Sequence, residues 1–433
     1  MNRRRRALLY GLAAAVASLA GGRLTQLAFA RPGSTSSDEI LVAIFLRGGV
    51  DGLSLVAPYG DANYNDLRPN IRLAAPGSGP NAALDLDGQF GLHPTAAPLA
   101  ELFQQQHLAV VHAAGLTSDT RSHFDAMDYM ERGTPGARNT NSGWLTRHLL
   151  STNSSGPLPV IAVASLIPGS LLASPLAVAI PDPRRFGLPG HWYYLDSQRR
   201  ALRHAYNGDT WLHEAGMQTL NALDVVESAN PGDYEPEFGA VYPQNDFGDA
   251  LMTVAQMVKL GLGLQVATAD LGGWDTHEYQ GDNGEGYLAY MMEVLALGLY
   301  ALYTDLTNFT NRLTVVVMSE FGRRLRENAN HGTDHGHGNV MLVLGGHVNG
   351  GVVYANPWPG LEPGALDQGT DLAITTDYRR VLSEILVRRL ANPNLGQVFP
   401  GYTGYTPFNI VQGADLPINY GGSGRVYLPS VSR

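Results

Sequence analysis

The chain has 433 residues, of which 44% are hydrophobic and 16% charged, and this is enough for one large α/β domain. Its net charge of −10, without basic clusters, argues against nucleic acid as a partner. The chain contains no cysteine, which excludes disulfides, thiolate nucleophiles and cysteine-ligated metals. Any metal site must therefore use oxygen and nitrogen ligands.

Residues 1–30 are typical of an export signal. Arg3 to Arg6 are followed by a short, mostly apolar stretch, and Ala28-Phe29-Ala30 forms a small-x-small cleavage site. Arg5-Arg6-Ala7-Leu8-Leu9 matches the twin-arginine pattern, and an ordinary secretory signal with a very basic start is the alternative. We therefore expect a periplasmic or extracellular protein with no stable membrane span after signal cleavage.

The first strand is predicted at residues 39–46, a continuous apolar run typical of a buried parallel strand. The glycine-rich turn that follows places Asp51 at the carboxyl end of this strand, where ligands bind in open α/β sheets. Asp51 is thus a candidate metal ligand. A role in a turn or helix cap is the alternative.

A second strand is predicted at residues 107–112, and a helix begins after it at Ser122. Ser122 with Asp125 forms a capping-box pattern. Because the N-terminus of a helix favours negative charge, a serine there can act as a nucleophile or bind a phosphoryl group. The local pattern alone favours the simpler alternative, in which Ser122 only caps the helix.

Residues 133–205 are irregular and rich in proline and glycine, so they are a candidate cap or substrate-binding insertion. Helices are predicted at residues 209–228 and 249–262. A strand at 265–271 then ends in a glycine turn followed by Asp275 and His277, two side chains that suit one cation.

A long helix with an apolar stripe from Leu288 to Phe309 leads into the strand at residues 313–318, which predicts a βαβ crossover. Glu320 stands at the end of that strand. The following loop carries the candidate ligands Asp334, His335 and His337, and a further strand closes it. A solvated histidine-rich loop is the alternative. One more helix is predicted at 376–390.

Several strand ends thus carry carboxylates or imidazoles. A mixture of the two ligand types suits zinc best, with manganese or iron as alternatives and calcium less well. We expect one or two divalent ions. The candidate metal ligands are Asp51, Asp275, His277, Glu320, Asp334, His335 and His337.

Six motifs together resemble the bacterial family known as domain of unknown function 1501, in order over roughly residues 38–400. They are RGGVDGLSLVAPYGDANYNDLRP, SHFDAMDYME, GGWDTH, VVVMSEFGR, GTDHGHGNVMLVLGG and TDYRRVLSEIL. The resemblance implies export by the twin-arginine route and membership of the alkaline phosphatase-like superfamily. It also implies a three-layer α/β/α sandwich with a mostly parallel sheet, formed by residues 31–433 as a single domain.

The superfamily pattern implies a role for each candidate. Asp51 resembles the first-strand metal ligand, Ser122 the nucleophile, and Asp275 with His277 one metal pair. Either Glu320 with His335 or His337 resembles the second pair, or Asp334 with His335 does, and we favour Glu320 because it directly follows a buried strand. Two departures leave one metal or a degenerate site open: Phe321 stands where the pattern has histidine, and Asp275 and His277 are unusually close in sequence.

Arg47, Arg121 and Arg323 lie beside the motifs and could hold a phosphate or sulfate oxygen, with ordinary pairing as the alternative. The segment around Ser122 lacks the pattern that formylglycine sulfatases need. We therefore expect an exported metal-dependent hydrolase that cleaves a phosphate or sulfate ester, using Ser122 or a metal-bound water as the nucleophile. The alternative is a non-catalytic extracellular binding protein with a degenerate metal site.

Overall fold

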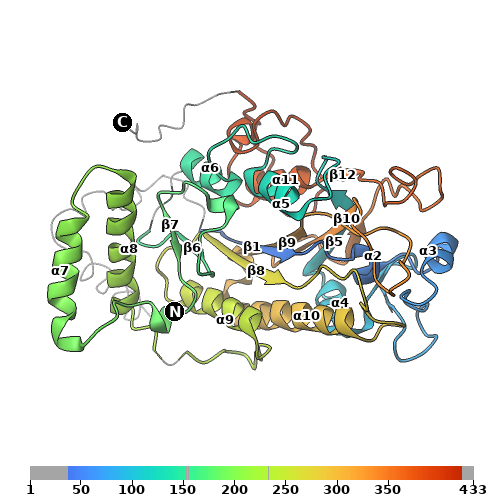
Figure 1. Ribbon diagram of the computed structural model, residues 1–433, viewed down its shortest axis with the longest axis horizontal. Coiled ribbons are helices and arrows are strands. Elements are labelled where there is room, and N and C mark those ends of the chain that lie inside the picture. Colours follow the sequence, from blue (N-terminus) through green and yellow to red (C-terminus); the bar gives the residue numbers. More distant parts are fainter. Residues whose placement is uncertain (1–37, 153, 155, 233, 422–433) are drawn as a thin grey trace.

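The computed structural model describes residues 38–421, apart from residues 153, 155 and 233. The predicted signal, residues 1–30, lies outside the described residues. A nine-stranded sheet crosses the molecule in the order β11-β5-β10-β9-β1-β8-β6-β7, with β12 also paired to β5 (Figure 1). Its strands are β1 (Ile40–Arg47), β5 (Leu108–Gly115), β6 (Val160–Ala162), β7 (Ala177–Ala179), β8 (Val266–Gly272), β9 (Leu313–Ser319), β10 (Asn339–Gly345), β11 (Val352–Tyr354) and β12 (Thr376–Asp377).

All strand pairs in this sheet are parallel except those of β10, which runs antiparallel to both β9 and β5. The carboxyl end of β9 and the start of β10 therefore lie at the same edge of the sheet. The long loop between these strands turns back at that edge, where β1 and β8 also end.

Helices cover both faces of the sheet, as Figure 1 shows. One face carries α4 (Ala97–Gln104), α9 (Asp246–Lys259) and α10 (Tyr287–Asp305), and the other carries α5 (His123–Arg132), α6 (Trp144–Ser151) and α11 (Tyr378–Arg388). Strand β1 contributes alternate residues to the two cores: Ile40, Val42 and Ile44 to one, and Leu41, Ala43 and Phe45 to the other. The three-layer α/β/α class predicted from the sequence is confirmed.

The apolar stripe predicted from Leu288 onward belongs to α10. Leu288, Leu295 and Leu299 are buried in the core beneath the sheet. Among the described residues, α10 is the one helix long and apolar enough to cross a membrane. Its contacts with α9 and α4 are those of a core helix of the domain.

The segment predicted as a cap, residues 133–205, contributes α6 and also extends the sheet through β6 and β7. Beyond the β7 edge, α7 (Leu195–Ala205) and α8 (Trp211–Ser228) form a hairpin that projects from the body (Figure 1). The smaller elements are α2 (Gly52–Leu55), α3 (Ala62–Leu67), α12 (Leu395–Val398) and a second sheet of β2 (Val56–Ala57), β3 (Leu84–Asp85) and β4 (Gly91–Leu92).

Candidate metal centre

The glycine turn after β1 brings three strand ends together. A side chain at Gly48, whose φ is +122°, would place its Cβ 2.6 Å from the backbone nitrogen of Asp275. A Cβ at Gly49 would lie 2.5 Å from the ring of Phe321. Both distances are too short for a real side chain. Glycine at these positions lets the ends of β1, β8 and β9 pack closely, and the polar side chains that follow the strands meet above them.

Asp275 is the centre of this arrangement. Its Oδ1 accepts a hydrogen bond from Nη2 of Arg323 at 2.7 Å. The guanidinium of Arg323 is buried and also donates to the carbonyl groups of Gly49, Trp274 and Thr333. Arg323 therefore fixes the turn and the carboxylate together.

Two histidines approach Asp275 from different loops. Nε2 of His335 lies 3.1 Å from Asp275 Oδ1, and Nε2 of His277 lies 3.1 Å from the same oxygen. The other ring nitrogens face acceptors: Nδ1 of His335 is 2.8 Å from the carbonyl of Arg121, and Nδ1 of His277 is 3.3 Å from Oδ1 of Asp334. Each ring thus presents Nε2 to the centre.

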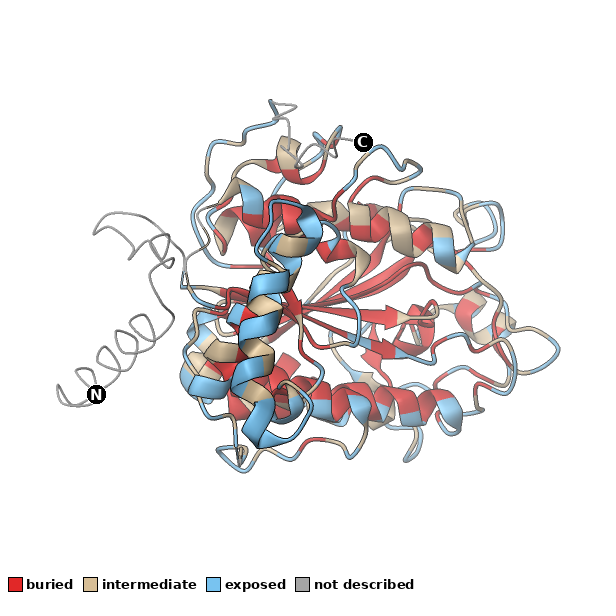
Figure 2. Cartoon of the chain, turned by 60° about the vertical axis from the view of Figure 1, so that its left-hand side comes forward, coloured by how far each residue is buried: buried red, intermediate tan, exposed pale blue. Residues whose placement is uncertain are grey.

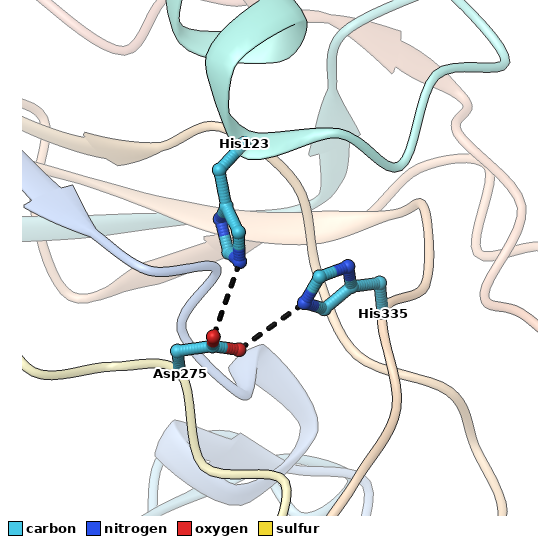
Figure 3. Close-up of side chains that lie close together, drawn as sticks. All are labelled: His123, Asp275 and His335. Carbon is cyan, nitrogen blue, oxygen red and sulfur yellow. Dashed lines mark hydrogen bonds and ion pairs between the residues drawn. The ribbon is translucent and has the colours of Figure 1, made fainter.

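A third histidine, His123, is the first residue of α5. Its Nδ1 lies 2.7 Å from Oε1 of the fully buried Glu320, which also accepts from the backbone N–H of Gly48 at 2.9 Å. Its Nε2 points at Oδ2 of Asp275 from 3.4 Å, as Figure 3 shows, and is buried without a hydrogen-bond partner. We call His123, Asp275, His277 and His335 the histidine–aspartate cluster.

The proton positions make this cluster a good cation site. When each Nδ1 donates to its acceptor, each neutral ring has only a lone pair at Nε2. The Nε2 atoms of His277 and His335 are 2.9 Å apart, so two lone pairs face each other. Such a contact needs a proton or a cation between or beside the nitrogens. One nitrogen of His123, one of His335 and a carboxylate oxygen of Asp275 all lie within 4.8 Å of one another, a spacing that can surround one metal ion.

The surrounding charges hold the cluster in ligand form. Burial alone would raise the pKa of Asp275, but the hydrogen bond from Arg323 and the interaction with the His335 ring lower it to about 2. Burial lowers the pKa of His335, which favours the neutral ring. By contrast, the hydrogen bond to Glu320 raises the pKa of His123, which favours its protonated ring, so a cation that binds here must displace this proton. Carboxylate–histidine pairs of this kind orient metal-binding imidazoles in many proteins.

Phe321 forms an apolar wall of the cluster. Its ring centroid lies 4.8 Å from that of His123 and 4.8 Å from that of His335, and the residue is 1% exposed. Phe321 thus packs against two imidazoles and contributes no ligand.

Asp51, predicted as a metal ligand, lies in a different environment at the same edge. It is fully buried, and its two oxygens accept from Nη1 and Nη2 of Arg68 at 2.7 and 3.0 Å. Ser54 and Gln280 donate further hydrogen bonds to Oδ2. The structure does not bring Asp51 into the cluster, because Arg68 and these two neighbours already occupy its carboxylate.

Ser122 is exposed, and its side chain caps α5 by accepting from the backbone N–H of Asp125. His337 lies apart from the cluster, with Nδ1 2.6 Å from Asp367 and Nε2 2.8 Å from the carbonyl of Ser118. Neither of these candidates contacts the cluster.

The predicted arginines also have partners. Arg47 pairs with Glu131 and Asp270, and Arg121 pairs with the buried Asp371. Arg323 lies at the cluster, where it holds Asp275. Two predicted metal ligands, Glu320 and Asp334, contact ring nitrogens from behind instead of facing the centre.

His123 was not among the candidates from the sequence. The signal for it was its place beside Ser122 at the first position of a predicted helix. The capping pattern drew attention to the hydroxyl, whereas the helix start positions the neighbouring imidazole.

The central part of the chain matches a family of known sequences. A model of the family described as "Protein of unknown function (DUF1501)" matches residues 213–371. The resemblance to this family is confirmed. The matched segment includes Asp275, His277, Glu320 and His335, and ends before the C-terminal helix α11. No curated protein matches the chain.

Two solved structures show weak overall likeness. The C-terminal periplasmic domain of EcEptC from Escherichia coli, in complex with Zn, is 11% identical with a TM-score of 0.38, over 89% of this chain and 94% of that one. The phosphonate monoester hydrolase of Agrobacterium radiobacter is 12% identical with a TM-score of 0.32, over 85% and 79%. Likenesses of this size do not establish a shared activity.

Proposed function

We propose that the protein is an exported metal-dependent hydrolase that cleaves a phosphate or sulfate ester at the histidine–aspartate cluster. The observation that carries the proposal is the convergence of three Nε2 atoms on Asp275, with every Nδ1 held by an acceptor. Structural histidines normally satisfy both ring nitrogens within the protein, whereas the buried Nε2 of His123 has no such partner.

The ligand set would be His123, His277, His335 and Asp275. Three imidazoles and one carboxylate suit zinc, with manganese or iron as alternatives, and suit calcium poorly because calcium takes oxygen ligands. One ion fits the described cluster. Asp51 and His337, which a second ion would need under the superfamily pattern, are bonded to Arg68 and Asp367 instead.

A divalent cation held here would supply Lewis acidity and would lower the pKa of water beside it. Glu320 and Asp334 hold the Nδ1 protons of His123 and His277. The ring of Phe321 packs against His123 and His335. Arg324 is exposed, and its ion pairs with Asp334 and Asp371 are long, at 3.9 and 4.0 Å. Arg324 is therefore the arginine best placed to donate hydrogen bonds to an ester oxygen.

The proposal favours water over Ser122 as the nucleophile. The Ser122 hydroxyl faces the first turn of α5 as a cap, and none of its hydrogen bonds reaches the cluster. Ser122→Ala should therefore preserve most of the hydrolytic activity, and loss of activity in a folded Ser122→Ala variant would restore the serine mechanism.

The test combines metal content with activity. Elemental analysis of the mature protein should find about one transition metal ion per chain, and a screen of phosphate monoesters, phosphate diesters and sulfate esters should find turnover that chelation removes. Asp275→Ala should lose both metal and turnover. His204→Ala, which removes an exposed histidine of α7, is the control and should keep both. A metal-free, inactive wild type would refute the proposal.

A second candidate is a non-catalytic member that keeps the cluster only to bind metal. Two observations favour this candidate: the carboxylate of Asp51 is bonded to Arg68, and Ser122 caps α5. In a two-metal hydrolase, Asp51 would bind metal and Ser122 would be the nucleophile. This candidate predicts bound metal, a lower melting temperature after chelation, and no turnover of any ester in the screen.

A further inference from the structure

The α7–α8 hairpin carries an aromatic surface that the metal centre does not use. Trp192, Tyr193 and Tyr194 are 76%, 67% and 63% exposed at the start of the hairpin. No residue of α7 is buried, and Figure 2 shows this helix in front with its outer side exposed. Three adjacent exposed aromatic residues on a projecting element indicate a contact surface.

Arginines accompany these rings. Arg185 has an 88% exposed side chain, and Arg200 is exposed on the outer side of α7. The two segments that carry them meet at Glu227, which binds Arg199 at 2.6 Å and lies beside Gly187. We call Arg185, His191, Trp192, Tyr193, Tyr194 and Arg200 the aromatic–basic patch.

The local charge is opposite to that of the molecule. Residues 182–213 contain five arginines and three histidines against three aspartates, whereas the whole chain has a net charge of −10. The arginines that face α8, Arg199 and Arg203, are paired with Asp224. Arg200 is exposed and has no ion pair among the described residues.

The geometry points to an anionic lipid surface as the occupant of this patch. Tryptophan and tyrosine prefer the membrane–water interface, where the ring is buried and its polar edge stays wet. Arginines beside them are attracted to anionic headgroups. Because α8 and the rest of the chain are acidic, the molecule would approach such a surface with the aromatic–basic patch first.

Two other occupants fit less well. A sugar polymer stacks best along a row of nearly coplanar rings. The Trp192–Tyr193 and Tyr193–Tyr194 pairs are instead nearly perpendicular, with interplanar angles of 85° and 89°. A second copy docked patch to patch would bring the same arginines, Arg185 and Arg200, from both copies into one interface, where their like charges repel. The projecting, convex patch therefore suits a broad anionic surface better than either.

Vesicle sedimentation of the mature protein tests the inference. The wild type should sediment with phosphatidylglycerol-containing vesicles at low salt, much less with pure phosphatidylcholine vesicles, and less as salt rises. The fluorescence of Trp192 should shift to the blue on binding. Trp192→Ser with Tyr193→Ser and Tyr194→Ser should abolish sedimentation, and Arg185→Glu with Arg200→Glu should reduce the partition coefficient at least ~10-fold.

Matched controls separate the patch from net charge and from folding. Arg72→Glu with Arg326→Glu changes the charge equally at exposed positions elsewhere and should leave binding unchanged. Since none of the patch residues is buried, circular dichroism of the patch variants should equal that of the wild type. Equal binding to both vesicle types, or unchanged binding by the patch variants, would overturn the inference. Concentration-dependent oligomers that the patch variants abolish would also overturn it and assign the patch to a second copy.

Discussion

Asp51 and Asp275 occupy matching positions and have different environments. Each follows a buried parallel strand and a glycine turn, and each pairs with an arginine distant in sequence. Asp51 is fully buried and receives both arms of Arg68. The side chain of Asp275 is 48% exposed and meets one arm of Arg323, while its second oxygen faces His123.

The difference shows what makes a strand-end aspartate a candidate ligand. A carboxylate whose lone pairs are all taken by buried donors cannot bind a cation without breaking those bonds, which costs several kcal/mol. Arg323 binds only Oδ1 of Asp275, so Oδ2 has no donor among the described residues and faces the Nε2 atom of His123. The four predictions below test this contrast, beginning with the largest expected effect.

Asp51→Ala should destabilise the fold by ~3–5 kcal/mol, because it leaves the buried guanidinium of Arg68 without its counter-charge. Urea unfolding would measure the loss, and Asp209→Ala, at an exposed position, is the control. Metal content per folded molecule should stay at the wild-type value. A stable Asp51→Ala variant that has lost its metal would move Asp51 back into the ligand set.

Asp275→Ala should lose metal affinity and should change the stability of the fold less than Asp51→Ala does. Metal affinity should fall at least ~100-fold, since even the outer partners of a metal site are worth 10–100-fold. Stability without metal should change less than in Asp51→Ala, because Arg323 keeps its carbonyl partners at Gly49, Trp274 and Thr333. Competition with a chromogenic chelator would measure the affinity, and wild-type affinity in this variant would contradict the assigned centre.

Glu320→Gln should weaken metal binding by ~10–100-fold with the fold retained. The amide removes the charge that orients the Nδ1 proton of His123. Its oxygen can still accept from His123 and Gly48, but its NH₂ then replaces the oxygen that accepts from Ser319. Glu293→Gln, at an exposed position on α10, is the matched control. Unchanged affinity in Glu320→Gln would remove Glu320 from the support of the centre.

The last prediction concerns the pH dependence of stability, which depends on the fully buried His112 of β5. Burial lowers the pKa of His112 from 6.5 to about 4, and its ring bonds to the carbonyl of Val56 and the N–H of Ala113. The unfolded state then binds more protons between these two values, so stability is lost as pH falls through this window. This shift corresponds to about 3 kcal/mol over the whole window, of which roughly 2 kcal/mol is lost by about pH 5.

Urea unfolding across that pH window would measure the effect. His112→Gln should flatten the pH dependence, whereas the same change at His204, which is exposed on α7, should leave the curve as in the wild type. An unchanged slope in His112→Gln would show that this ring is hydrated in the folded state.

Much of the fold could be predicted from the sequence because its signals are local. Continuous apolar runs predicted β1, β8 and β9, and the leucine stripe predicted α10. The glycine turns marked the strand ends where polar side chains gather. Helix α9 begins at Asp246, three residues before the predicted start, because the side chain of Asn245 caps it by accepting from the N–H of Gly248.

The residue patterns predicted a buried parallel sheet, the edge at which the candidate ligands lie and the ligand types available there, and the family resemblance implied the three-layer class. Which of the candidates face one another depends on the tertiary structure. Arg68 seals Asp51, while α5 carries His123 to Asp275 and its hydroxyl neighbour Ser122 remains a cap. Local patterns report the periodicity and capping of a single element, whereas ligation depends on the distances between elements that are set by strand order and by buried pairs far apart in the chain.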